Sequence, residues 1–331
     1  MKKKISLIIG ILGMTWTCTC LYGQNNTLPV YLDENQPIES RIEDALSRMT
    51  LKEKTRLRYA QGKFSSPGCP RLGIPELWMS DGPHGVRAEV NWNDWGYAGW
   101  TNDSCTAFPA LTCLAASWNP QLAAKYGKAI GEEARYREKD VLLGPGVNIY
   151  RTPLNGRNFE YMGEDPYLAA EMCVPYIQGV QSNGVAVCVK HYALNNQELW
   201  RDHIDVQVSD RALREIYLPA FRAAVQKGHA WSIMGAYNKV RGEYATHNEL
   251  LINKILKGEW GFDGCVITDW GAAHDTYQAA MYGLDIEMGT YTNGLTSESE
   301  FGYDDYYLGH NYLKMVEEGK IPMEVVNDKA A

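Results

Sequence analysis

The stretch that decides the fold is Gly264-Cys-Val-Ile-Thr-Asp-Trp-Gly-Ala272. Its apolar residues 265–267 run without a polar break into Thr268, Asp269 and Trp270, and a glycine follows. A short apolar run bounded by glycines is typical of a strand buried on both faces, as in parallel sheets. Proteins with α/β folds gather their chemistry where such strands end. We therefore expect Asp269 to be a functional residue.

Short apolar runs and helical segments alternate along the rest of the chain. The expected strands are residues 77–79, 111–116, 141–143, 185–189, 231–236, 265–267 and 284–288. The amphipathic segments between them are 120–139, 166–183, 210–227 and 248–260. Alternating β and α units predict a parallel sheet with right-handed crossovers. Because 331 residues exceed the roughly 250 that a (β/α)8 barrel needs, this pattern favours a closed TIM-like barrel.

The two ends of the chain complete the expected domain organisation. Residues 1–23 combine three lysines, an apolar segment and a small residue before Gln24, which is typical of a secretory signal peptide. The apolar segment is short for a membrane span, so we expect export to a periplasm or the extracellular space, without stable membrane insertion after cleavage. Residues 24–37 predict an N-terminal arm and residues 38–331 the barrel domain. The short uncapped helix after Pro322 predicts a barrel truncated in its last helix.

Within the barrel domain, Thr50 followed by Glu53 predicts a capping box between two helices near its start.

Composition and residue spacing disfavour several classes of ligand. The chain has 32 basic and 40 acidic residues, and its net charge of -8 argues against a nucleic-acid partner. Its cysteines and histidines do not occur in zinc-site spacing, and the Gly144-Pro145-Gly146 turn lacks the pattern of a phosphate-binding loop. We therefore expect no metal and no cofactor.

Polar residues follow five of the expected strands. The segments concerned are Ser80 to Arg87, Gly144 to Asp165, Lys190-His191, Tyr237-Asn238 and Asp269-Trp270. A single polar residue after a strand is an ordinary turn, but carboxylates, arginines, a lysine and a histidine at successive strand ends would converge on one face of a barrel. Such a ring suits the hydroxyl groups of a sugar, and Trp270 adds an apolar surface for the sugar's C–H groups.

Five motifs resemble glycoside hydrolase family 3, in its β-glucosidase branch. They are Ser80-Asp-Gly-Pro-His-Gly-Val-Arg87, Gly156-Arg-Asn-Phe-Glu-Tyr-Met-Gly-Glu-Asp-Pro166, Val189-Lys-His-Tyr-Ala-Leu-Asn-Asn-Gln-Glu198, Met234-Gly-Ala-Tyr-Asn-Lys239 and Ile267-Thr-Asp-Trp-Gly-Ala272. They occur in the family's order, and the resemblance covers roughly residues 38–331. The resemblance implies a TIM-like barrel and a retaining mechanism through a covalent glycosyl-enzyme.

The resemblance also implies roles for ten residues. Asp269 would be the nucleophile, and Asp81 would accept hydrogen bonds from hydroxyls at the far side of the non-reducing-end sugar. Tyr237 would lie beside the nucleophile, and Met234 and Trp270 would form apolar walls. The remaining residues of the sugar subsite would be Arg87, Arg157, Lys190, His191 and Arg201. Cations around Asp269 would keep it ionised at neutral pH.

A retaining glycosidase also needs a second carboxyl group as acid/base. The resemblance to the β-glucosidase branch implies that this acid/base residue is located in a second domain that follows the barrel. We expect that domain to be absent from this chain. Another branch of the family uses an Asp-x-His pair as acid/base. Asp202 and His203 are adjacent in the corresponding loop of this chain and are an alternative acid/base pair, although they lack the sequence motif of that branch. We expect Glu164 and Asp165 to organise the loop before Pro166, and His84 to be structural.

The aromatic segment of residues 91–100 is either a platform for a glycan or a surface buried against another domain.

These observations predict an exo-acting β-glucosidase whose substrate is a β-linked oligosaccharide or glycoside. A β-xylosidase or α-L-arabinofuranosidase of the same family is one alternative. A barrel that binds sugar without catalysis is the other.

Overall fold

The computed structural model describes residues 28–92, 94–99, 104–289 and 302–331. The predicted signal peptide lies outside the described residues. The described chain divides after Asp44 into two units. In the first unit a helical turn (Val30–Leu32) precedes the start of α1 (Ile38–Arg48), and the N–H of Tyr31 donates to Oδ2 of Asp44 at 3.0 Å. The second unit contains the sheet and the remaining elements.

A six-stranded sheet in the order β1-β2-β3-β4-β6-β9 forms the centre of the second unit. Its strands are β1 (Ser65–Ser66), β2 (Leu77–Asp81), β3 (Val141–Leu143), β4 (Ala186–Tyr192), β6 (Ser232–Gly235) and β9 (Cys265–Thr268). The strands from β2 to β9 are parallel, as the sequence predicted, and each pairs with the next one of the sheet. β5 (Asp205–Val206), β7 (Lys239–Val240) and β8 (Glu243–Tyr244) form a separate small sheet.

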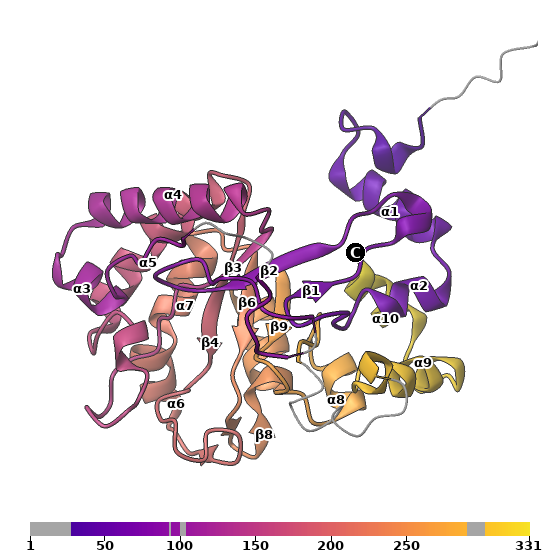
Figure 1. Ribbon diagram of the computed structural model, residues 1–331. Helices are drawn as coiled ribbons and strands as arrows, with labels where there is room; N and C mark the ends of the chain where they lie inside the picture. The colour runs from indigo at the N-terminus through magenta and orange to yellow at the C-terminus, as the bar shows by residue number, and fades with distance from the viewer. Residues whose placement is uncertain (1–27, 93, 100–103, 290–301) are drawn as a thin grey trace, which may run out of the picture. The chain divides into compact units, whose positions relative to one another are not determined.

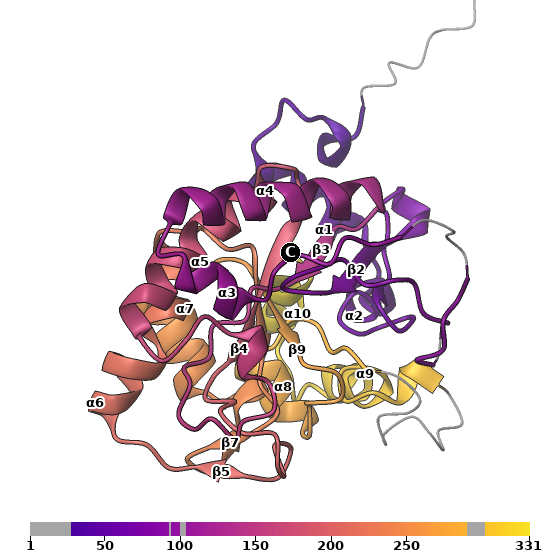
Figure 2. The ribbon, with the colours of Figure 1, turned by 60° about the vertical axis from the view of Figure 1, so that its left-hand side comes forward.

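Isolated bridges continue the main sheet beyond β9. Ile267 pairs in parallel with Ile286, and Glu287 pairs in parallel with Tyr59. The segment predicted as a strand at residues 284–288 is thus present only as these bridges. After Tyr59 the chain reverses direction at an antiparallel bridge between Gly62 and Ser65. Strand β1 in turn runs antiparallel to β2. A parallel connection needs a crossover of a dozen or more residues, and the link from Ser66 of β1 to Leu77 of β2 is too short for one. The result is a mixed sheet that follows the path of a TIM-like barrel (Figure 2).

Helices cover the outside of the sheet, and α4, α5 and α7 pack next to one another beside β3, β4 and β6 (Figure 1). The helices of the second unit are α2 (Leu51–Arg56), α3 (Leu111–Ala116), α4 (Pro120–Tyr136), α5 (Pro166–Gln181), α6 (Asp210–Ala212), α7 (Pro219–Gln226), α8 (Thr276–Met281), α9 (His310–Glu317) and α10 (Met323–Ala330), with π-helical segments at Leu213–Tyr217 and Leu250–Glu259. The predicted capping box is confirmed, because Thr50 and Glu53 exchange hydrogen bonds at the start of α2.

The strand predicted at residues 111–116 is wrong, because this segment is helix α3. Leu111, Leu114 and Ala115 are its buried residues, and their spacing is that of one helical face. A short apolar run does not by itself distinguish a buried strand from a buried helix, and the alanines of this run favour the helix.

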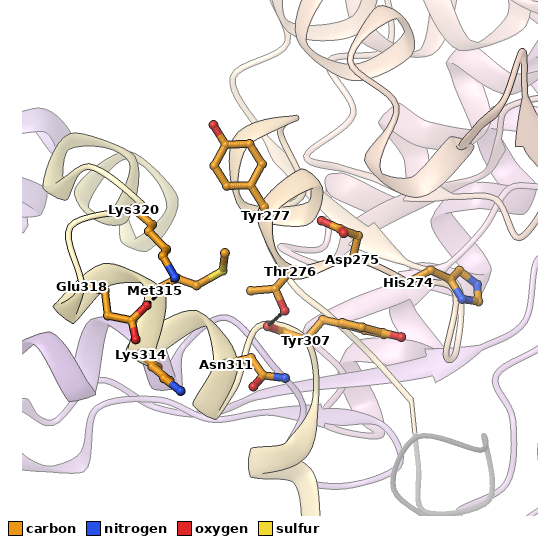
Figure 3. A pocket seen from close by; sticks show the side chains of 10 residues that line it. All are labelled: His274, Asp275, Thr276, Tyr277, Tyr307, Asn311, Lys314, Met315, Glu318 and Lys320. Carbon is orange, nitrogen blue, oxygen red and sulfur yellow. Dashed lines mark hydrogen bonds and ion pairs between the residues drawn. The ribbon is translucent and has the colours of Figure 1, made fainter.

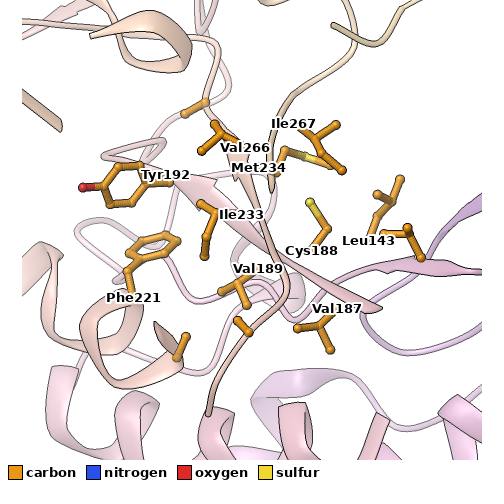
Figure 4. Close-up of a cluster of buried hydrophobic side chains, with 14 of the residues drawn as sticks. Leu143, Val187, Cys188, Val189, Tyr192, Phe221, Ile233, Met234, Val266 and Ile267 are labelled. Atoms are coloured by element: carbon orange, nitrogen blue, oxygen red, sulfur yellow. The ribbon is translucent and has the colours of Figure 1, made fainter. Parts of the chain in front are cut away.

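The alternation of side chains along the strands positions the functional face. Figure 4 shows Ile233 and Val189 toward Phe221 of α7, with Met234, Cys188 and Ile267 on the other side of the strands. Side chains two residues apart on a strand share a face. Lys190 therefore continues the side of Cys188, Asp269 continues that of Ile267, and Asp81 continues that of Met79. The three charged residues lie above the apolar interior layer, at the carboxyl ends of their strands.

Candidate active site

Asp269 lies directly after β9 and is buried, with 8% of its surface exposed. Its N–H donates to the carbonyl of Gly235 at 2.9 Å, and its Oδ1 accepts from the N–H of Trp270 at 2.8 Å. Its Oδ2 is buried and accepts no hydrogen bond of normal geometry from the described residues. One carboxylate oxygen is thus held by the backbone and the other is available to a ligand.

Three charged side chains form the centre of the site. Glu160 accepts from Nε of Arg157 at 2.7 Å through one oxygen and pairs with Nζ of Lys190 at 2.8 Å through the other. All three side chains are at least four-fifths buried, and the two cations hold the pKa of Glu160 well below its usual range, against the effect of burial. Since a lost partner would leave a buried charge, this cluster fixes the two cations beside Asp269.

His191 connects this cluster to Asp269. Its Nε2 lies 2.9 Å from Nη2 of Arg157, and its Nδ1 lies 3.0 Å from the hydroxyl of Tyr161. Burial, with the charges of Arg157 and Lys190, lowers the pKa of His191 well below its usual value, so the ring is neutral. A guanidinium only donates, so Nε2 accepts and Nδ1 carries the proton that it donates to Tyr161. The 3.5 Å approach of Nε2 to Oδ2 of Asp269 is therefore not an ion pair.

The main chain at His191 is fixed by Asn148. Its side-chain oxygen accepts from the N–H of His191 at 2.7 Å, and its side-chain nitrogen donates to the His191 carbonyl at 2.9 Å. The pairing of β4 with β6 shifts register between Val189 and Tyr192. This irregularity lets the consecutive residues Lys190 and His191 both reach the cluster, although regular alternation would send them to opposite faces.

Asp81 and Arg87 lie at one side of the cluster. Arg87 Nη1 is 3.1 Å from Oδ2 of Asp81, and Lys190 Nζ is 3.9 Å from the other oxygen. The side chains of Asp81 and Arg87 are 36% and 39% exposed, so this pair stays open to solvent.

Arg201 lies at the other side of the cluster, next to Glu198 and Tyr237. It pairs with Glu198 at 2.5 Å, and its guanidinium lies 4.4 Å from the centre of the Tyr237 ring. Glu198 also lies 3.9 Å from Nη1 of Arg157, and the Tyr237 hydroxyl donates to the carbonyl of Trp270 at 3.0 Å. The structure therefore brings together eight of the ten predicted residues as one polar site around Asp269.

The two predicted apolar walls are both buried. Met234 is 1% exposed and packs in the core layer of Figure 4. Trp270 is 5% exposed, its indole N–H donates to the carbonyl of Lys63 at 2.7 Å, and its ring packs 5.2 Å from that of Phe64. The contact of both residues with a sugar stays a prediction.

Burial raises the pKa of Asp269, while the charges of Arg157 and Lys190 and the N–H of Trp270 oppose that rise. The cations expected from the sequence are present, but burial has the larger effect, so the pKa of Asp269 lies above its ordinary value. Removing a cation from this site would raise the pKa of Asp269 further.

The alternative carboxylates lie apart from this arrangement. Asp165 caps α5 by accepting from the N–H of Tyr167 at 2.8 Å, and Glu164 beside it is exposed. Asp202 and His203 are also exposed, with side chains 56% and 65% accessible. His84 is half-buried, and its ring lies edge-on to that of Phe159 at 5.8 Å.

Sequence reasoning did not assign Glu160, Glu198, Tyr161 or Asn148 to the site. Glu160 and Tyr161 stand within a quoted motif, and the three-residue spacing of Arg157 and Glu160 is a signal for a local ion pair. Asn148 carries no such signal, because its partner is a backbone 43 residues away.

Two further features of the described residues bear on ligand class. They contain no group of three His, Cys, Asp or Glu side chains placed to hold a metal ion. In the part of the chain that the structure describes, no helix is both long enough and apolar enough to cross a membrane. A hollow of about 400 Å³ between α8 and α9 lies apart from the cluster, and its Lys320 already pairs with Glu318 at 2.6 Å (Figure 3).

Comparison with known families gives a match over most of the chain. Residues 70–331 match the model of the glycosyl hydrolase family 3 N-terminal domain. The chain belongs to glycoside hydrolase family 3. The family predicted from the sequence motifs is therefore confirmed.

Relatives within glycoside hydrolase family 3 include several β-glucosidases. The chain is 83% identical to the beta-glucosidase BoGH3A of Bacteroides ovatus over 329 residues, which is 99% of this chain and 44% of that protein. It is 42% identical to the thermostable beta-glucosidase B of Acetivibrio thermocellus over 86% of this chain and 36% of that protein. The chain thus spans less than half the length of these family 3 relatives.

The fold agrees with solved family 3 structures. Beta-glucosidase 3B of Thermotoga neapolitana in complex with glucose superimposes with a TM-score of 0.78 at 39% identity, over 87% of this chain and 41% of that one. The TIM-like α/β fold predicted from sequence is confirmed.

Proposed function

We propose that this chain carries the nucleophile and sugar subsite of an exo-acting retaining β-glucosidase, with Asp269 as the nucleophile. The observation that carries the proposal is the buried Oδ2 of Asp269, which has no hydrogen-bond partner among the described residues and lies beside the cations Arg157 and Lys190. The names of the family 3 β-glucosidases, and the glucose complex of one of them, support glucose as the sugar.

The chemical step follows from this arrangement. Oδ2 of Asp269 attacks the anomeric carbon, the bond from that carbon to the aglycone oxygen breaks, and a glycosyl ester forms. The aglycone oxygen takes a proton from a general acid. Water then cleaves the ester and restores the Asp269 carboxylate. The neutral His191 accepts only from Arg157 at Nε2, so it does not compete for the attacking oxygen.

The remaining charged residues suit a hydroxylated ring. Asp81 offers carboxylate oxygens, and Lys190 and Arg157 offer donors that Glu160 fixes in place. Such donors and acceptors hold sugar hydroxyls in one orientation, and hydrogen bonds to them strengthen as positive charge develops on the ring.

The general acid is a separate requirement. Asp81, Glu160 and Glu198 each lie within an ion pair, and an acid must instead hold a proton near the pH of the reaction. We therefore expect the 331-residue chain to hydrolyse 2,4-dinitrophenyl β-glucoside, whose leaving group needs no proton, in preference to cellobiose. Because proton transfer contributes about 10²–10⁴-fold, the kcat/KM for the dinitrophenyl glucoside should exceed that for cellobiose by a factor of about 10²–10⁴. Comparable rates on the two substrates would mean that an acid lies within the chain.

Covalent labelling tests the nucleophile. A 2-deoxy-2-fluoroglucoside with a dinitrophenolate leaving group should add one fluoroglucosyl group to the wild-type chain, located by peptide mass spectrometry on Asp269. Asp269→Asn should abolish the label, and Asp202→Asn, on an exposed loop carboxylate, should keep it. Labelling that persists in Asp269→Asn refutes the assignment.

A pentosidase is the second candidate. The chain is 45% identical over 244 residues to an exo-alpha-(1->6)-L-arabinopyranosidase of Bifidobacterium longum. Aryl α-L-arabinosides and β-xylosides compared with the aryl β-glucoside distinguish the two activities. Binding of glucose without turnover of any aryl glycoside would favour a non-catalytic sugar-binding barrel.

We also propose that the protein is exported to the periplasm or beyond. The support is the positive and apolar sequence of residues 1–23. N-terminal sequencing of the protein recovered from the periplasmic and extracellular fractions tests it, and an intact Met1 in the cytoplasmic fraction would contradict it.

A further inference from the structure

A second pocket lies at the opposite end of the strands from Asp269. It has a volume of about 690 Å³ and is formed where the chain enters β6 and β9. Small-molecule sites in proteins have volumes of about 300–1,000 Å³. Four residues of extended chain separate the β9 entry from Asp269, which is roughly 13 Å, so this pocket is distinct from the catalytic cluster.

Aromatic rings and uncharged or acidic polar groups line this pocket. Trp231 is 49% exposed, Trp260 is partly exposed, and Phe262 is buried. The polar side chains are those of Gln226, His229 and Asp263, all exposed. The ten described lining residues include no Lys or Arg, which disfavours an anionic ligand.

Trp231 is held in place although its ring is exposed. Its backbone N–H donates to Oε1 of Gln181 at 2.9 Å, and its backbone carbonyl accepts from the N–H of Cys265 at 3.0 Å. The same Gln181 donates from Nε2 to the carbonyl of His229 at 2.9 Å. These hydrogen bonds fix the main chain at Trp231, so the segment that carries the ring is in position before a ligand binds.

The approach of the two chain segments depends on Gly264. A Cβ atom there would lie 2.3 Å from the Trp231 carbonyl oxygen and 2.8 Å from the Phe262 ring. The glycine therefore permits the close contact that brings Trp231 and Phe262 to one pocket.

We propose that this pocket is a second saccharide-binding site, which takes a neutral β-glucan chain by stacking a pyranose ring on Trp231. The C–H faces of a pyranose match an exposed aromatic ring, and its hydroxyls match the rim of amide, imidazole and carboxylate groups. The site would hold the chain on polymeric substrate. It does not depend on the chemistry at Asp269.

Affinity electrophoresis with hydroxyethylcellulose in the gel tests the site. The wild-type chain should be retarded by the polysaccharide, and Trp231→Ala should weaken that binding about tenfold or more, as loss of a central tryptophan does in other interfaces. Trp118→Ala is the matched control, since Trp118 is 74% exposed and lies outside the pocket. Hydrolysis of the aryl glucoside should be unchanged in both variants.

Asp263→Ala, at an exposed position, provides a second variant if Trp231→Ala fails to fold, and it should also reduce retardation. Wild-type mobility that is insensitive to the polysaccharide overturns the proposal, as does equal retardation of wild type, Trp231→Ala and Asp263→Ala. The proposal is also overturned if Trp231→Ala changes the oligomeric state measured by size exclusion but leaves retardation by the polysaccharide unchanged, because a second copy of the chain would then be the occupant of the pocket. A chain that is retarded without hydrolysing any glycoside refutes the proposed function and leaves this site standing.

Discussion

Substituting Glu160 by Gln tests how the site is held together. The side chain keeps its volume but loses the charge that pairs with Arg157 at 2.7 Å and with Lys190 at 2.8 Å. Lys190 retains only the more distant Asp81 at 3.9 Å, which is partly exposed. Removing one partner of a buried ion pair costs about 3–5 kcal/mol. At about 2 °C per kcal/mol for a large domain, the midpoint of thermal unfolding should fall by roughly 6–10 °C.

Thermal unfolding followed by circular dichroism measures this loss. Glu164→Gln is the matched control, because it makes the same change of charge at an exposed position four residues along the chain. We expect Glu164→Gln to change the midpoint by about 1 °C or less. If Glu160→Gln behaves like Glu164→Gln, the buried triad of Arg157, Glu160 and Lys190 does not stabilise the fold and the reasoning fails.

The same variant has a second readout at the proposed nucleophile. Without the anion of Glu160, the charges of Arg157 and Lys190 act more strongly on Asp269 and lower its pKa. The acidic limb of the pH dependence of kcat/KM for the aryl glucoside should therefore move to lower pH. A limb that moves to higher pH would contradict this electrostatic account.

Two other predictions concern stability. Burial raises the pKa of Glu287 to about 7, so the folded chain keeps this carboxyl protonated at pH values where the unfolded chain, with the ordinary glutamate pKa of 4.5, has lost the proton. Its stabilising contribution is full below pH 4.5 and is lost as pH rises through 7, a change of roughly 3 kcal/mol. In urea unfolding, Glu287→Gln should show a smaller fall in stability between pH 5 and pH 8 than wild type, and an equal fall would refute the assignment. Thr50→Ala removes the capping box of α2 and should cost about 1 kcal/mol in the same assay, whereas Thr50→Ser should retain most of it.

The residues recovered from the sequence share one property. Asp81, Lys190 and Asp269 each follow an apolar run, and the carboxyl ends of parallel strands meet at one face whatever the details of packing. Local pattern is enough to identify such positions. The capping box at Thr50 and Glu53 was predictable for the same reason, since its partners are three residues apart.

The errors arose where a local pattern permitted two outcomes. The apolar run at residues 111–116 is compatible with a strand or a buried helix, and tertiary packing of Leu111 and Leu114 made it α3. The pattern of longer strands also did not predict the two-residue strand β1, which runs antiparallel to β2.

The sequence by itself determined the fold class, the strand ends that carry polar groups and the family, because periodicity and long motifs are local properties of the chain. Only the tertiary structure decided which of these groups are partners. It placed Glu160 between Arg157 and Lys190 and directed Nε2 of His191 to Arg157, and among the described residues it gave Oδ2 of Asp269 no hydrogen-bond partner. Those outcomes depend on distances between residues far apart in the chain and on burial. Both arise only when the strands are brought together.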